Sequence, residues 1–317
     1  MEQAVKSKPK KIGYFKGLKK RFRKHKDIIW FVFPVIILTL IFGYLPMTGV
    51  IFAFKEDIRA FNWFYDVLTQ PLTFRHITAI VQDAQVLVAL KNTLIISVSK
   101  IIIFFPLTII FAILLAEIKR PAISKLILII LCLPNFLSWP VTIGIWNNLL
   151  GETGLVNNII ASLGGERIFF FEDFFKPLVI LLSIWKGLGW GSIYFYSAIM
   201  SIDKEYYEAA TIDGATKMQK IWYLTLPGIL PVIALQLVMN ITYILDAGFD
   251  QVYAMLQLVR LYTYEEQILG TYIFDLAMSN SKIPFTVAMS VVNGALALFL
   301  MLGGNTFVKK KLGRSLW

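Results

Sequence analysis

The sequence is poor in the residues on which soluble enzymes and secreted domains depend. Charged residues make up only 16% of its 317 residues, against about 25% in an ordinary soluble domain. Cys132 is the only cysteine, which excludes a disulfide framework within the chain. Hydrophobic residues instead reach 57% and aromatic residues 15%. This composition excludes a disordered chain, a coiled coil and an ordinary soluble enzyme, and it is typical of a polytopic membrane protein.

Residues suited to catalysis are equally scarce. His25 and His76 are the only histidines, and no H-E-x-x-H, C-x-x-C or G-x-S-x-G pattern occurs. The chain also lacks the G-x-x-x-x-G-K-[ST] loop that holds nucleotide phosphates in many proteins. We therefore expect no catalytic residues, no metal site and no cofactor in this chain, and any driving energy has to come from another protein.

Long apolar runs predict the fold class, an all-α polytopic membrane protein. A helix needs about 20 apolar residues to cross the hydrocarbon core. Six runs of about this length occur, at residues 28–45, 90–115, 126–145, 178–200, 228–248 and 284–308. The first is too long for a cleavable signal peptide, and apolar sequence continues to residue 54. We expect a six-span transmembrane domain over residues 28–308, with an external helix between residues 250 and 283.

Charge predicts the orientation of these spans. The segment 1–27, the tail 309–317 and two of the loops together carry 21 Lys and Arg residues against 7 acidic ones, whereas the alternate loops carry 7 against 13. The positive-inside rule therefore places both termini in the cytoplasm and the chain in the cell membrane. Topology explains the net charge of +11 better than nucleic-acid binding does. Segment 1–27 is either an amphipathic helix on the anionic leaflet or a solvated tail.

The cytoplasmic loop 201–226 has the clearest local pattern. Asp203 is a suitable N-cap for a first short helix. Asp213-Gly214 is a turn signal. Residues 218–222 then place apolar side chains at the spacing of a second amphipathic helix, and Pro227 suits the first turn of the fifth span. The sequence therefore predicts a helix, a tight turn and a helix between two spans.

This loop resembles the signature loop of the permeases of ABC importers. Its pattern is Glu208-Ala209-Ala210, three residues, Gly214, nine residues, and then Leu224-x-Leu226-Pro227. Tyr207 before the motif and Ile212-Asp213-Gly214-Ala215 within it look like the carbohydrate-uptake branch. Resemblance to the polysaccharide or lipo-oligosaccharide subfamily extends to residues 43–47, 52–55 and 185–191 and to the tail around Asn305.

The resemblance implies a type I importer permease without its own ATPase. Such permeases pair with a second, related subunit and with two cytosolic subunits that bind ATP and Mg. An extracellular, lipid-anchored or periplasmic solute-binding protein delivers the substrate, here an oligosaccharide. By this analogy the loop is a coupling helix, and its contact with the ATPase uses Glu208, Ala209, Ala210, Asp213 and Gly214.

Residues of the translocation path are harder to predict. Lys100 and Lys186 are charged residues inside spans, which face protein or a water-filled cavity. Lys186 suits a polar contact on the path or a packing role equally well, and Lys100 suits packing better. Prolines interrupt the third span near residues 134–140, as happens where a helix lines a cavity. Further candidates for contact with sugar are Asn135, Trp139, Trp146, Trp185, Trp190, Tyr194, Asn240 and Tyr243, although each aromatic also suits the core or the membrane interface.

Two other functions remain open at the level of the sequence. The first is a permease of the same architecture for a non-sugar solute, which a strongly cationic cavity would favour. The second is a membrane-embedded enzyme or scaffold, which would need a cluster of acidic or metal-binding residues within the membrane.

Overall fold

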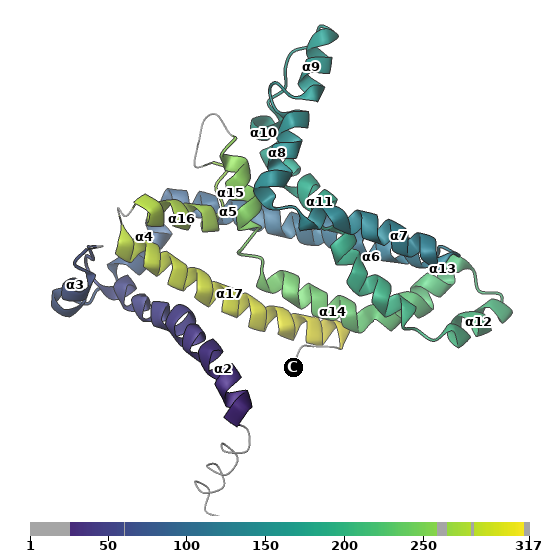
Figure 1. Ribbon diagram of the computed structural model, residues 1–317, viewed down its shortest axis with the longest axis horizontal. Helices are drawn as coiled ribbons and strands as arrows, with labels where there is room; N and C mark the ends of the chain where they lie inside the picture. The colour runs from purple at the N-terminus through teal and green to yellow at the C-terminus, as the bar shows by residue number, and fades with distance from the viewer. Residues whose placement is uncertain (1–25, 60, 259–264, 280–281, 314–317) are drawn as a thin grey trace, which may run out of the picture. The chain divides into compact units, whose positions relative to one another are not determined.

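The computed structural model describes residues 26–59, 61–258, 265–279 and 282–313 (Figure 1). The chain divides into two compact units, residues 1–52 and 53–317. Helix α2 (Lys26–Leu38) opens the first unit and continues as the π-helix η1 (Thr39–Tyr44) and the 3₁₀-helix η2 (Leu45–Phe54). The predicted surface helix within segment 1–27 lies outside the described residues except for Lys26 and Asp27.

Within the described residues the second unit is helical, apart from one isolated antiparallel bridge between Lys55 and Leu72. Its helices before the predicted coupling loop are α3 (Trp63–Thr69), α4 (Arg75–Gln82), α5 (Ala84–Ser99), η3 (Lys100–Phe104), α6 (Phe105–Ala116), α7 (Pro121–Cys132), η4 (Leu133–Phe136), α8 (Trp139–Leu150), α9 (Leu155–Ser162), α10 (Phe170–Asp173) and α11 (Phe175–Met200). The remaining helices are α12 (Lys204–Ile212), α13 (Lys217–Lys220), η5 (Ile221–Thr225), α14 (Leu226–Thr242), α15 (Phe249–Leu256), α16 (Leu269–Ser279) and α17 (Ile283–Leu312). Helices α15 and α16 occupy the segment in which we expected an external helix.

Five of the predicted spans are single long apolar helices. They run over Trp30–Phe54, Ala84–Ala116, Phe175–Met200, Lys217–Thr242 and Ile283–Lys310. The fifth predicted span starts earlier than expected, because α13, η5 and α14 wind as one continuous helix. Pro227 occupies the first turn of α14, as predicted, and the π-turn η5 joins that turn to α13 in one longer span. That helix also ends at Thr242, short of the predicted residue 248.

The third predicted span is not one straight helix over residues 126–145. It consists of Pro121–Phe136 and Trp139–Ser162, which meet at an angle of 99°. Pro134 and Pro140 lack the amide hydrogens that a continuous helix would need, and Leu137 and Ser138 adopt extended backbone angles. The predicted interruption of the third span is confirmed. Counted as one span, the bent pair brings the number of candidate spans in the described residues to six.

Helix α11 runs through the second unit and packs along α6, α7 and α14. Its glycines allow a close approach to α6 and α7. A Cβ atom on Gly189 would lie 2.6 Å from the backbone nitrogen of Cys132 and closer still to the backbone of Leu131. A Cβ on Gly191 would meet the side chain of Thr108 at 2.7 Å. Helices α11 and α7 therefore approach this closely only because Gly189 has no side chain.

Replacing Gly189 by alanine is expected to destabilise the protein by about 1–3 kcal/mol, because the added methyl group meets backbone that has to move. Thermal unfolding in detergent measures this change. Gly144→Ala is the matched control, because a Cβ there has no neighbour within 4 Å. Equal unfolding temperatures of the two variants would contradict the packing argument.

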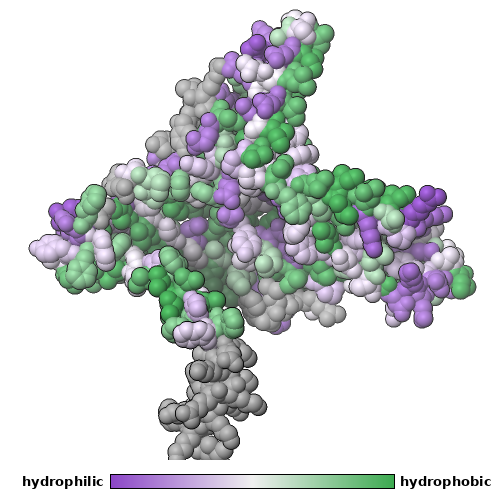
Figure 2. Space-filling model, in the orientation of Figure 1, coloured by the Kyte–Doolittle hydropathy of each residue, from purple (hydrophilic) through white to green (hydrophobic). Residues whose placement is uncertain are grey.

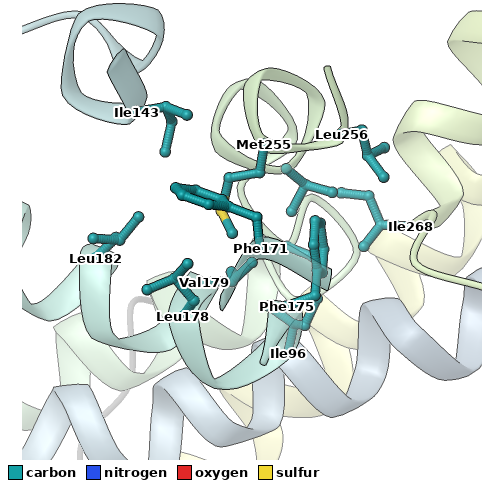
Figure 3. Packing of buried hydrophobic residues seen from close by; sticks show 12 residues of the cluster. Ile96, Ile143, Phe171, Phe175, Leu178, Val179, Leu182, Met255, Leu256 and Ile268 are labelled. Atoms are coloured by element: carbon teal, nitrogen blue, oxygen red, sulfur yellow. The ribbon is translucent and has the colours of Figure 1, made fainter. Parts of the chain in front are cut away.

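Buried apolar residues form separate clusters where the helices cross. One cluster joins α5, α8, α11 and α15 around Phe171, Phe175 and Met255 (Figure 3). A second joins α6, α11 and α14 around Phe195. Many large apolar side chains of the same helices are exposed, and Figure 2 shows them as broad hydrophobic areas on the second unit. Such areas are expected where helices face lipid or other membrane-embedded chains.

The segment between the first two spans is fixed by polar contacts. His76 Nε2 lies 3.1 Å from the carbonyl oxygens of both Lys55 and Glu56. The imidazole ring therefore has a structural role. The Arg59 guanidinium donates to the carboxylate of Asp66 at 2.7 Å. These bonds hold the pKa of Asp66 below its usual value. This pair therefore stabilises the fold above the ordinary pKa of aspartate, and its contribution is lost as the pH falls through the lowered one.

Candidate functional site

The loop after α11 forms a helix, a tight turn and a second helix, as the sequence predicts. Helix α12 begins after Asp203, whose carboxylate accepts a hydrogen bond from the Glu205 amide at 3.0 Å. The turn contains Gly214, whose φ of +78° lies in the left-handed region that favours glycine. Thr216 and Gln219 form a capping box at the start of α13. Local sequence alone thus determines both helix starts and the turn.

Side-chain contacts fix α12 against the helix that follows it. The hydroxyl groups of Tyr207 and Thr225 lie 3.0 Å apart, and Lys220 Nζ donates to Thr211 Oγ1 at 2.6 Å. Because Thr225 and Lys220 belong to the continuous helix Lys217–Thr242, α12 is joined to the end of a span. A displacement of α12 therefore moves that span with it.

The residues of the signature motif lie on the surface of this loop. Glu208, Ala209, Asp213 and Gly214 are exposed and Ala210 is half-buried. The Glu208 carboxylate has no hydrogen bond or ion pair with any described residue. An open pocket of about 310 Å³ lies beside the motif, between the Asp213–Ala215 turn and Tyr223, and Figure 2 shows hydrophilic side chains gathered around α12. This surface suits docking into a groove that carries a basic side chain.

Lys186, on α11, lies against the break in the third span. Its side chain is buried, and Nζ donates to the carbonyl oxygens of Leu137 at 2.6 Å, Asn135 at 2.9 Å and Pro134 at 3.4 Å. Nζ also lies 5.2 Å from the centre of the Trp139 ring. An ammonium group has three donors, so these carbonyls account for all of them. The contacts satisfy the carbonyl groups of Asn135 and Leu137, which have no backbone donor in the described structure, whereas the Pro134 carbonyl also accepts from the Leu137 amide at 3.2 Å.

Other predicted path residues surround the same break. Trp185 packs edge-to-face on Trp146 with ring centres 5.6 Å apart, and Trp190 packs similarly on Phe136 at 6.3 Å. The structure therefore brings together Asn135, Trp139, Trp146, Trp185, Lys186 and Trp190. The other three candidates lie elsewhere: Tyr194 is exposed further along α11, Asn240 donates to Gln236 on its own helix, and Tyr243 is exposed at the end of α14.

Residues 104–308, which contain both the break and the loop, match the family model described as "Binding-protein-dependent transport system inner membrane component". The chain belongs to this family. The match spans well over half of the chain, so this protein is a permease component of a binding-protein-dependent transport system in the membrane.

Individual relatives match the permease over almost its whole length. Protein LplB of Bacillus subtilis is 31% identical over 301 residues, which cover 91% of this chain and 90% of LplB. The polygalacturonan/rhamnogalacturonan transport system permease protein YteP of the same organism is 32% identical, covering 90% and 89% of the two chains. The crystal structure of a bacterial alginate ABC transporter, in complex with its alginate pentasaccharide-bound periplasmic protein, contains a chain with a TM-score of 0.81 and 31% identity. That similarity covers 94% of this chain and 99% of the other.

The permease also has one candidate residue, Thr142, that the sequence did not single out. Thr142 is fully buried, and its hydroxyl group has no hydrogen-bond partner in the described structure. The indole nitrogen of Trp146 is likewise buried without a partner among the described residues. A buried polar group without a partner is costly, so both groups are candidates for a polar partner that the described residues do not supply. The spacing of Thr142 from Trp139 and Trp146 on one face of α8 is the signal that would have found it.

No group of three or more His, Cys, Asp or Glu side chains within the described residues is placed to hold a metal ion. Cys132 is buried in α7 next to α11, where it packs as a small apolar residue.

Proposed function

We propose that this permease forms one half of the translocation path for oligosaccharides or polysaccharide fragments in an ATP-driven importer. The other half is a second, related permease. Two cytosolic subunits bind ATP and Mg, and an extracellular solute-binding protein delivers the substrate. The similarity to YteP and to the alginate transporter over nearly the whole chain supports oligosaccharides or polysaccharide fragments as the class of substrate. Both termini lie in the cytoplasm in this proposal, on the basis of the charge distribution.

The observation that carries the proposal is the exposed signature loop. Glu208, Ala209, Ala210, Asp213 and Gly214 present a free carboxylate and small side chains on a rigid helix. That helix is tied by hydrogen bonds to a span. Closure of an ATPase dimer bound to this surface would pull on Lys217–Thr242 and thereby reorient the path. The cluster at the break of the third span supplies aromatic faces, on which the apolar C–H faces of sugars stack.

Affinity purification of the permease in mild detergent, followed by mass spectrometry, tests the assembly. We expect a second permease and two copies of an ATP-binding subunit to co-purify. Adding the solute-binding protein loaded with polygalacturonan or alginate fragments, or with neutral oligosaccharides, is expected to raise ATP hydrolysis in reconstituted vesicles. A 36.1 kDa chain that purifies alone in repeated preparations would contradict the proposal. Stimulation by a non-sugar solute in place of all oligosaccharides would favour the alternative permease.

A further inference from the structure

A second break in the helical bundle follows the helix that starts in the coupling loop. The helix Lys217–Thr242 ends at Thr242, and the chain turns through residues 243–248 before α15 begins. Ala247 and Gly248 have φ angles of +50° and +83°, so the turn uses left-handed backbone at two successive positions. Within this turn the carbonyl groups of Ile244 and Ala247 have no backbone donor in the described structure.

Two side chains from the neighbouring span hold this break. Ser97 Oγ donates to the carbonyl oxygen of Ile244, and Lys100 Nζ donates to that of Ala247 at 3.0 Å. Ser97 and Lys100 are three residues apart, where α5 passes into the π-helix η3. A Cβ atom on Gly248 would lie 2.8 Å from Lys100 Nζ, so the glycine gives the ammonium group its space.

Gln251 extends these contacts to a third span. Its side chain is fully buried, and Oε1 accepts from Lys100 Nζ at 3.1 Å and from Ser183 Oγ at 2.7 Å. Its Nε2 donates to the carbonyl oxygen of Val179 at 2.7 Å. The surroundings are apolar, because Val179 and Ala247 belong to the cluster in Figure 3. In such surroundings a satisfied polar network is strong and an incomplete one is costly.

The network therefore connects the end of the coupling-loop helix to two other spans. The helix Lys217–Thr242 has 26 residues and a length of about 39 Å at 1.5 Å per residue. A displacement of α12 would reach the turn 243–248 along this one continuous helix. There the motion has two possible outcomes: the turn flexes and absorbs it, or α5 and α11 move with α14.

We propose that Lys100, with Gln251 and Ser183, is a positioning joint that transmits motion of the coupling loop to Ala84–Ala116 and to α11. The proposal rests on the coupling role proposed above for α12. Lys100 acts through backbone carbonyls and Gln251 and touches no substrate. Its function is to stop the left-handed turn from flexing, so that one ATP-driven displacement of α12 moves three spans together.

Lys100→Met tests the joint in the complete importer, reconstituted in vesicles with its ATPase subunits and loaded binding protein. Lys91→Met is the matched control, because Lys91 lies on the same helix and is exposed, without a bond to any described residue. The decisive readout is the number of substrate molecules imported per ATP hydrolysed. We expect Lys100→Met to lower this ratio at least about tenfold while ATP hydrolysis continues, and Lys91→Met to keep the wild-type ratio.

Three further measurements separate the possible causes of a change. Wild-type vesicles test the proposed function itself, since failure of loaded binding protein to stimulate their ATPase contradicts the importer and not the joint. Lys100→Arg keeps a donor and is expected to recover most of the ratio. Ser183→Ala removes one bond to Gln251 with little change in volume, and we expect a ratio lowered severalfold. If Lys100→Met does not assemble, the number of substrate molecules imported per ATP by Ser183→Ala decides whether the joint exists. A wild-type ratio in Lys100→Met, or in Ser183→Ala when Lys100→Met does not assemble, overturns the joint.

Discussion

Replacing Glu208 by lysine is expected to abolish the stimulation of ATP hydrolysis by loaded binding protein, while the permease still folds and inserts. Glu208 is exposed on α12 and has no partner in the described structure, so its replacement removes no contact of the fold. Exposed substitutions of this kind change stability by less than about 0.5 kcal/mol. In the proposed importer, however, we expect Glu208 to meet a basic side chain of the ATPase groove, which the new positive charge would repel. We expect the stimulated rate to fall at least about tenfold, measured in reconstituted vesicles.

Glu205→Lys is the matched control for this result. Glu205 is an exposed carboxylate on the same helix, one turn earlier and outside the signature motif. We expect this variant to retain at least half of the stimulated rate, with a small loss of helix stability because a positive charge is unfavourable in the first turn. An equal loss in both variants would assign the effect to the surface charge of α12 in general. Normal stimulation in Glu208→Lys would refute the coupling role.

Replacing Lys186 by alanine is expected to destabilise the permease and reduce its assembly, and not to remove uptake selectively. The ammonium group donates to three carbonyl groups at the break of the third span, and it is the only donor in the described structure for two of them, those of Asn135 and Leu137. Each buried acceptor left without a donor costs about 1–3 kcal/mol. At about 2–4 °C per kcal/mol for a chain of this size, the unfolding temperature is expected to fall by at least about 5 °C. Thermal unfolding in detergent and co-purification of the partner subunits measure the two effects.

Lys176→Ala is the control, because Lys176 lies on the same helix and has no bond to any described residue. We expect its unfolding temperature to stay within about 1 °C of the wild type. An unchanged unfolding temperature and full assembly in Lys186→Ala, together with loss of uptake, would show that the ammonium group serves the path and not the break. Since all three donors of Lys186 are already engaged, the structure favours a loss of stability and assembly in Lys186→Ala over a selective loss of uptake.

The sequence predicted the features that depend on neighbouring residues. Apolar runs gave the number of candidate spans, because a helix crossing lipid needs a fixed number of apolar residues. The helix–turn–helix of the coupling loop followed from Asp203 and Gly214, which act on the backbone within a few residues of themselves. The interruption at Pro134 and Pro140 was also predictable, since proline removes a helical hydrogen bond wherever it occurs. The size of the bend and the continuous helix from Lys217 were not.

Only the tertiary structure decided what the buried polar groups of the spans do. The sequence left Lys186 between the path and packing, and it gave no role to Gln251. In the structure Lys186 bonds to carbonyls 49 to 52 residues away, and Lys100 bonds to Gln251 at a separation of 151 residues. A lysine in a span needs partners because burying its charge alone is costly. Which groups become those partners depends on how distant helices pack, and the local pattern of residues contains no information about that.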